Sequence, residues 1–136
     1  MIRPIVKDTM FLSRKSVPAK KGDERDALDL IDTLRSKADI CVGMAANMIG
    51  IDKTIIAVNL NGLTICMYNP VLSNLKKPYV HEEGCLSLNG TRSVKRYGEV
   101  DVTFFDLNWK KRRMHLSGFN AAIVQHECDH LEGILI

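Results

Sequence analysis

The sequence lacks the features that mark membrane proteins and exported proteins. No stretch of 18 apolar residues occurs among its 136 residues, so no transmembrane helix is expected. Residues 1–8 contain neither the apolar run nor the cleavage site of a signal peptide. We therefore expect a cytoplasmic protein with no membrane partner.

A strong net charge and a disulfide pattern are also missing. The net charge is only +3, and the densest basic run, residues 110–113, fits a solvated hairpin face better than a nucleic-acid patch. We therefore expect no direct nucleic-acid partner. The four cysteines are not spaced as a disulfide framework, so in a reducing compartment they are thiols, and at least one could be a metal ligand. They are Cys41, Cys66, Cys85 and Cys128.

What remains is an ordinary globular composition, with 46% hydrophobic and 26% charged residues. A chain of this length buries roughly two-thirds of its unfolded surface, which is enough for a hydrophobic core without disulfides. No internal repeat, low-complexity tract or linker divides it. We expect a single domain over residues 1–136.

The pattern of apolar residues predicts a helix, a run of antiparallel strands, and a second helix. Residues 1–22 are expected to be irregular, residues 23–37 helical, and residues 41–50 a segment of small residues between glycines. The predicted strands and the last helix are residues 54–60 and 63–68 around Asn61-Gly62, a short strand at 70–74, a hairpin of 99–106 with 109–116, and a helix at 119–131. This order predicts an α+β fold of antiparallel sheets and hairpins packed around the C-terminal helix.

The most informative segment is His126-Glu127-Cys128-Asp129-His130. On a helix, residues four apart point the same way, so His126 and His130 can bind one divalent ion. Glu127 lies about 100° around the helix and can reach a water molecule at the metal without being a ligand. The alternative is two surface histidines that share a helix by chance. The predicted burial of this face favours a metal site.

Two histidines leave a catalytic metal site one protein ligand short. Cys85 is the best candidate for the third ligand, because it lies between predicted strands and next to Gly84, which lets the backbone come close. Taken alone, Cys85 fits a small buried residue and Glu83 fits a solvated acid. The combination with the two histidines makes both candidates for the site.

Three ordered segments resemble the motifs of peptide deformylases, which remove the N-formyl group from nascent polypeptides. They are residues 43–46 (Gly-Met-Ala-Ala), 83–87 (Glu-Gly-Cys-Leu-Ser) and 125–133 (Gln-His-Glu-Cys-Asp-His-Leu-Glu-Gly). The resemblance covers nearly the whole chain, and its last two motifs are highly specific together. It implies a monomeric metallohydrolase that acts on N-formylmethionyl peptides, at the ribosome.

The resemblance also assigns roles to residues. The metal ligands would be Cys85, His126 and His130, and the metal Fe²⁺, with Zn²⁺ or Ni²⁺ able to replace it. Glu127 would be the general acid–base, and the backbone N–H of Leu86 would help bind the oxyanion. Val42 and Gly43 would border an apolar pocket for the methionine side chain. The further candidate substrate contacts are Glu83 and Arg92; a solvated strand residue is an equally good interpretation of Arg92.

The first motif departs from the family at its end, where relatives keep a glutamine whose amide helps hold the oxyanion. Met48 occupies that place and has no N–H to donate, and Asn47 stands one position earlier. Loss of one such donor typically costs about 10²–10³ in rate. Asn47 could substitute after a backbone shift, or the enzyme could be intrinsically slow.

The chain departs from the family at two further places. Cys41 replaces the usual first glycine of the same motif. The chain also stops at Ile136, where many relatives continue, and we expect that shorter end to affect stability more than chemistry.

Three alternatives to an active deformylase remain open at this stage. A non-catalytic or weakly active metal-binding paralogue is favoured by Met48. A zinc endopeptidase shares the histidine–glutamate segment but does not account for residues 83–87. A structural zinc site would need a fourth protein ligand, and Cys128 points away from the two histidines on the predicted helix.

Overall fold

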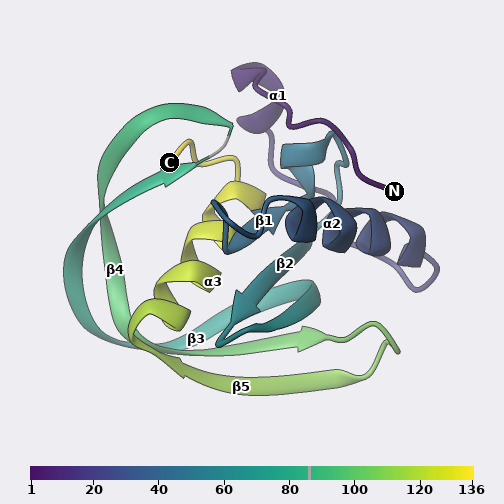
Figure 1. Cartoon of the computed structure of the whole chain (residues 1–136). Coiled ribbons are helices and arrows are strands. Elements are labelled where there is room, and N and C mark those ends of the chain that lie inside the picture. The colour runs from purple at the N-terminus through teal and green to yellow at the C-terminus, as the bar shows by residue number, and fades with distance from the viewer. Residues whose placement is uncertain (86) are drawn as a thin grey trace.

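The computed structural model describes residues 1–85 and 87–136, and Figure 1 shows how their elements are arranged. In chain order the elements are α1 (Thr9–Leu12), α2 (Glu24–Ser36), β1 (Gly43–Ala45), the 3₁₀ helix η1 (Ala46–Ile49), β2 (Ile55–Leu60), β3 (Leu63–Cys85), β4 (Leu88–Phe105), β5 (Lys111–Ser117) and α3 (Gly118–Leu131). This arrangement confirms the predicted α+β fold with a C-terminal helix.

The strands form one antiparallel sheet in which each strand pairs with its neighbour in the chain, in the order β1-β2-β3-β4-β5. The long β3–β4 hairpin curves around α3, and α3 packs against β1, β2, β4 and β5 (Figure 1). Helix α2 lies on the other side of the molecule and packs against β1 and β2. The sheet therefore encloses the last helix, which carries the predicted metal ligands.

The first predicted hairpin is confirmed. Strands β2 and β3 pair from Ile55 with Tyr68 to Leu60 with Leu63, around Asn61-Gly62. Both turn residues have a positive φ, 54° and 84°, which is the backbone conformation that this dipeptide adopts most readily.

The two predicted helices are also confirmed, with small changes. In α2, the buried face contains Ala27, Leu30, Ile31 and Leu34, whereas Leu28, which was expected on that face, is 43% exposed. Helix α3 begins at Gly118, one residue before the predicted start. Residues 1–22 are largely irregular, as expected, but include the short helix α1.

The length of the β3–β4 hairpin is the main difference from the sequence prediction. The short strand expected at residues 70–74 is only part of β3, and β4 begins at Leu88 rather than near residue 99. Many side chains along this hairpin are polar and exposed, and the pairing is interrupted by register shifts between Tyr68 and Val71 and between Ser73 and Lys76. Such strands lack the regular alternation of apolar and polar residues from which a sequence predicts them.

The turn between β4 and β5 is longer than predicted. Trp109, which was expected to begin a strand, has a φ of 59° and lies in the turn. Its ring stacks on Phe105 at 5.0 Å between centroids, and the Asp106 carboxylate accepts hydrogen bonds from two backbone N–H groups of the turn. A five-residue turn with an Asp cap therefore replaces the tight turn around Leu107-Asn108.

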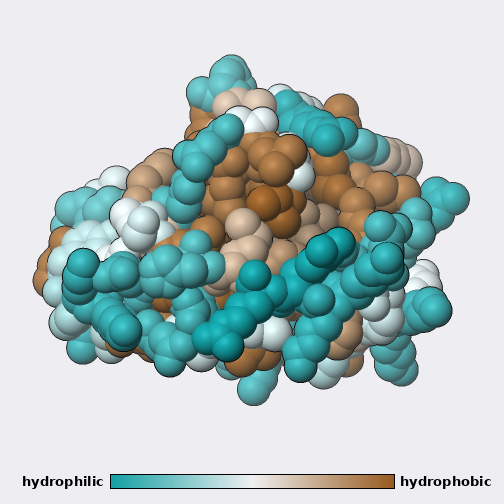
Figure 2. Space-filling view, turned by 90° about the horizontal axis from the view of Figure 1, so that it is seen from below, coloured by the Kyte–Doolittle hydropathy of each residue, from teal (hydrophilic) through white to brown (hydrophobic). Residues whose placement is uncertain are grey.

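The hydrophobic core lies between the sheet and the two longer helices. Its largest fully buried residues come from α1, α2, β1, η1, β2, β3, β4 and α3, and they are Leu12, Leu30, Met44, Met48, Ile55, Ile56, Met67, Val58, Val100, Val102 and Val124. Hydrophobic side chains also reach the surface in a hollow bordered by hydrophilic ones (Figure 2). In the described part of the chain, no helix is both long enough and apolar enough to cross a membrane.

Candidate metal centre

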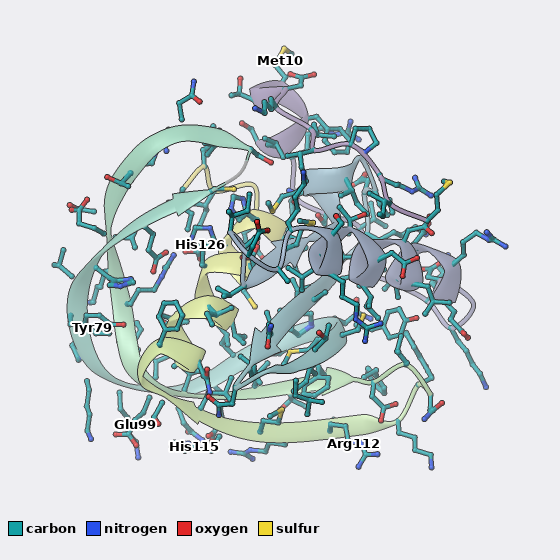
Figure 3. All side chains as sticks on the ribbon, viewed as in Figure 1. Met10, Tyr79, Glu99, Arg112, His115 and His126 are labelled. Atoms are coloured by element: carbon teal, nitrogen blue, oxygen red, sulfur yellow. The ribbon has the colours of Figure 1, made fainter. Side chains whose placement is uncertain are left out.

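Helix α3 places the two predicted histidine ligands one above the other. The Nε2 atoms of His126 and His130 lie 3.1 Å apart, and both rings are buried. His126 is on the side of α3 that faces the β3–β4 hairpin (Figure 3). The i, i+4 spacing of the sequence therefore produces two imidazole nitrogens that converge on one point.

Cys85 is the last residue of β3, rather than a residue between strands as predicted. The curvature of the β3–β4 hairpin brings it against α3, and its sulfur lies with one nitrogen of each histidine in a group whose atoms are all within 4.8 Å of one another. The backbone N–H of Ser87 approaches the sulfur at 3.4 Å. One thiolate and two imidazoles fit a borderline divalent metal, with room for a further ligand from substrate or solvent.

Glu127 lies beside this group and is 4% exposed. Its Oε1 atom has no hydrogen-bond partner among the described residues, and burial raises the pKa of its carboxyl to about 7. Gly43 makes room for the carboxyl: a Cβ atom on this glycine would lie 2.8 Å from Glu127 Oε2. A cation held by the neighbouring ligands would favour the ionised form of Glu127.

Glu83 contacts the ring nitrogen of His126 that points away from His130. Its Oε1 atom lies 2.6 Å from His126 Nδ1, and its carboxylate also accepts hydrogen bonds from Arg96 at 2.7 and 2.9 Å and contacts His81 Nδ1 at 2.8 Å. Burial opposes ionisation of Glu83, but the bonds from His126, Arg96 and His81 outweigh it and lower the pKa to about 2. These bonds give Glu83 a positioning role toward His126. Glu83 also borders the cavity at the site, so the predicted substrate contact stays a prediction.

Arg96 joins this carboxylate to helix α3. Its guanidinium group is buried and also donates a 2.7 Å hydrogen bond to Asp129. Sequence analysis missed Arg96, Asp129 and His81. The signal was weak, because Arg96 stands in a polar stretch whose pairing with β3 could not be predicted without the register of the long hairpin.

A cavity of about 580 Å³ opens at the centre, between α3, β1 and the tip of the β3–β4 hairpin. Val42 and Gly43 border it, as do the predicted ligands Cys85 and His126. The apolar residues of its wall are Ile40, Val42, Met48, Leu88, Phe119, Ala122 and Ile123. Its walls can therefore contact an apolar side chain of a ligand whose reacting group lies at the predicted metal ligands.

Arg92 does not belong to the lining of this cavity. It pairs with Glu83 across the hairpin, and its guanidinium group donates a hydrogen bond to the Asn89 carbonyl at 3.3 Å. The backbone N–H of Leu86, predicted to bind the oxyanion, lies outside the described residues.

Comparison with known proteins identifies the family. The family model described as Polypeptide deformylase matches residues 2–136. The chain belongs to the peptide deformylase family. Membership confirms the resemblance of the three motifs and the predicted class of enzyme, and none of the likenesses favours the non-catalytic alternative.

Individual peptide deformylases agree with this assignment. A Clostridium beijerinckii protein named Peptide deformylase is 51% identical over 136 residues, which are 100% of both chains. The Shewanella oneidensis protein named Peptide deformylase 3 is 34% identical, over 90% of this chain and 78% of that protein. A Met-Ala-Ser-bound crystal structure of class I type b peptide deformylase from Acinetobacter baumannii superposes with a TM-score of 0.89 and 28% identity, covering 99% of this chain and 97% of that chain.

At the position where the motif resemblance predicts a glutamine, this family member has an apolar side chain. Met48 borders the cavity, and its sulfur lies 3.4 Å from the Ala45 N–H. The Asn47 side chain is buried and reaches helix α3, where its Nδ2 atom donates a 2.8 Å hydrogen bond to the His130 carbonyl. The structure therefore gives no support to the first predicted explanation, a shifted Asn47, which stays a prediction.

Cys41, which stands where the motif resemblance predicts a glycine, adds a side chain to the cavity wall. Its thiol donates a hydrogen bond to the Gly43 carbonyl, with 2.9 Å between the sulfur and the oxygen. Burial raises the pKa of Cys41 to about 11, so the group stays a thiol at neutral pH.

Proposed function

We propose that this deformylase hydrolyses the formyl amide of N-formylmethionyl peptides at a divalent metal ion held by Cys85, His126 and His130. The observation that carries the proposal is the convergence of these three donor atoms next to Glu127, a buried carboxyl with an unpartnered oxygen. The resemblance of the motifs suggests Fe²⁺ as the metal, with Zn²⁺ or Ni²⁺ as replacements. The peptide in the Acinetobacter baumannii structure begins with methionine, which supports the same class of ligand.

When bound, such an ion supplies Lewis acidity, which polarises a carbonyl oxygen and makes water more acidic. The protein residues supply the rest of the chemistry. Glu127 accepts a proton from the attacking water at its free carboxylate oxygen and then donates it to the nitrogen of the departing amine. Its buried position keeps the carboxyl next to the reacting groups and away from bulk solvent.

Substrate binding follows from the cavity wall. The side chains of Val42, Phe119 and Ile123 would pack on the methionine side chain, and Gly43, which also borders the cavity, leaves room for the Glu127 carboxyl beside the substrate. The backbone N–H of Leu86 is the proposed donor to the oxyanion. Arg92 remains a candidate for contact with the peptide beyond the methionine.

Release of formate from a formyl-Met peptide tests the proposal. Anaerobically prepared, iron-loaded protein should release formate, and a chelator should stop the reaction. The Glu127→Gln variant should release formate roughly 10²–10⁴-fold more slowly than the wild type, which is the factor that general acid–base catalysis contributes. The variant should still bind the metal. Metal analysis of the variant is the control. Wild-type protein that holds iron and releases no formate would contradict the proposed activity.

A second test concerns the ligands themselves. Cys85→Ala, His126→Ala and His130→Ala should each lower the metal content of the purified protein. His115→Ala is the matched control, because this exposed histidine lies at the molecule's edge beside Glu99, 3.3 Å away (Figure 3). A loss of metal in the control equal to that in the ligand variants would count against the assigned site.

A further inference from the structure

Asn47 makes a buried hydrogen bond to His130, one of the three proposed metal ligands. It lies on η1, is 1% exposed, and donates its Nδ2 hydrogen bond to the His130 carbonyl at 2.8 Å. A carbonyl oxygen can only accept, so the amide nitrogen must face His130 and the amide oxygen must point elsewhere. That oxygen, Asn47 Oδ1, is buried and has no hydrogen-bond partner among the described residues.

The imidazole of His130 has a complementary unpaired atom. Its Nε2 faces His126 Nε2 at the proposed metal centre, so a metal would be bound through Nε2. A neutral imidazole whose Nε2 lone pair is engaged carries its hydrogen on Nδ1. In the described part of the chain, His130 Nδ1 is buried without a partner. A buried N–H group needs an acceptor, and metal-binding histidines almost always donate this second hydrogen bond.

We propose that Asn47 is a positioning residue of the metal centre, whose Oδ1 accepts the hydrogen bond of His130 Nδ1–H through one buried water molecule. The same amide then holds His130 at two points, the backbone carbonyl and the ring. Such a water would donate to Asn47 Oδ1 and accept from His130 Nδ1–H, and buried waters are held by polar groups in this way. The inference rests on the proposed metal site and does not depend on deformylation.

The position of Asn47 in the chain gives this contact a second consequence. Asn47 and Met48 are consecutive residues of η1; Met48 borders the substrate cavity and Asn47 reaches α3. One short turn therefore connects the cavity wall with the orientation of a ligand. His126 is held differently, by the Glu83 carboxylate, so the two histidines have separate supports.

The rate at which metal-loaded protein loses Zn²⁺ or Co²⁺ to an excess of chelator tests the proposal. Asn47→Ala should accelerate metal release about 10–100-fold, the usual effect of removing a partner of a metal-binding histidine. The visible absorption of the Co²⁺ form should also shift, because the ring is no longer held. Asn59→Ala is the matched control: it removes another amide whose oxygen is buried and unpartnered, on β2, and should leave both readouts unchanged.

A pair of nearly isosteric variants separates positioning from packing. Asn47→Thr keeps an oxygen atom that can accept a hydrogen bond, whereas Asn47→Val has the same shape without it. Slower metal release from the threonine variant than from the valine variant would support the proposal, and this comparison stands even if Asn47→Ala does not fold. Equal release rates in the pair, or an effect of Asn59→Ala as large as that of Asn47→Ala, would overturn it. Because the readout is metal release, an inactive but metal-binding wild type would leave this test intact.

Discussion

At the scale of single residues, Met48 stands where the motif resemblance predicts a glutamine. Its side chain is 1% exposed and borders the cavity, where it offers a sulfur atom instead of an amide N–H. The neighbouring amide of Asn47 is engaged with His130. Met48 thus has no hydrogen to donate to an oxyanion in the cavity, and the amide of Asn47 faces helix α3 instead.

Restoring the amide should therefore raise activity. Met48→Gln replaces one unbranched side chain by another of similar length and adds an N–H donor. We expect kcat to increase, by up to about 10²–10³ if this donor limits the reaction, as measured by formate release at saturating substrate. Met48→Leu, which adds no donor, serves as the control. An unchanged kcat in a folded, metal-loaded glutamine variant would show that another group already binds the oxyanion.

Gly43 is the second residue whose size decides the chemistry. An added Cβ would lie 2.8 Å from Glu127 Oε2 and 3.0 Å from Ile123 Cγ2, so one of these side chains would have to move. We expect Gly43→Ala to lower kcat at least tenfold, because the added methyl group displaces the Glu127 carboxyl. The thermal midpoint of unfolding should change little. Gly98→Ala is the control for general effects of the added methyl group, because its backbone is not left-handed and an added Cβ there would meet only Lys77, at 3.3 Å. Wild-type kcat in Gly43→Ala would contradict the assigned role of this close contact.

At the scale of elements, the buried Glu83–Arg96 pair joins β3 to β4, and Arg96 extends the connection to α3 through Asp129. Hydrogen bonds from His126, Arg96 and His81 outweigh the effect of burial and lower the pKa of Glu83 from 4.5 to about 2. A carboxyl whose pKa is lower in the folded state stabilises the fold at any pH above its unfolded pKa. That contribution is lost as the pH falls from about 4.5 towards about 2.

This pair predicts a specific pH dependence of stability. The free energy of unfolding of the metal-free wild-type protein should fall by about 2–3 kcal/mol between pH 5 and pH 2.5. Over this range the unfolded chain binds a proton at Glu83 that the folded protein does not. Glu83→Gln should be less stable at pH 7 and show a flatter curve over the same range. Urea unfolding at a series of pH values measures both curves. Parallel curves would mean that other carboxyls cause the acid sensitivity.

The sequence predicted those elements whose residues alternate or repeat regularly. Helix α2, the β2–β3 turn at Asn61-Gly62 and the helical pair His126 and His130 follow from local patterns, and the structure contains all three. The second half of β3 and the first half of β4, which pair with each other, could not be predicted in this way. Their side chains are largely polar, and the pairing of β3 with β4 includes register shifts. Arg96 was missed for the same reason, since its contact with Glu83 exists only once that register is known.

At the scale of the whole molecule, the proposed metal centre joins segments that are far apart in the sequence. Cys85 ends the curved β3–β4 hairpin, and the two histidines belong to α3, about 40 residues later. A ligand that binds only the folded state stabilises it by RT ln(1 + [L]/Kd). Metal binding should therefore stabilise the packing of the hairpin on the helix as well as supply chemistry.

This coupling predicts that the metal raises the thermal midpoint of unfolding. At a free metal concentration of about 100 times Kd the gain is about 2.7 kcal/mol, which for a domain of this size corresponds to roughly 10 °C. Differential scanning fluorimetry with Zn²⁺ and with chelator measures the difference. Cys85→Ala should reduce it strongly because one of the three ligands is gone, whereas the exposed His115→Ala should retain it. An identical midpoint with and without metal in the wild type would show that the ion does not bind the folded state more tightly than the unfolded chain, which would contradict the proposed site.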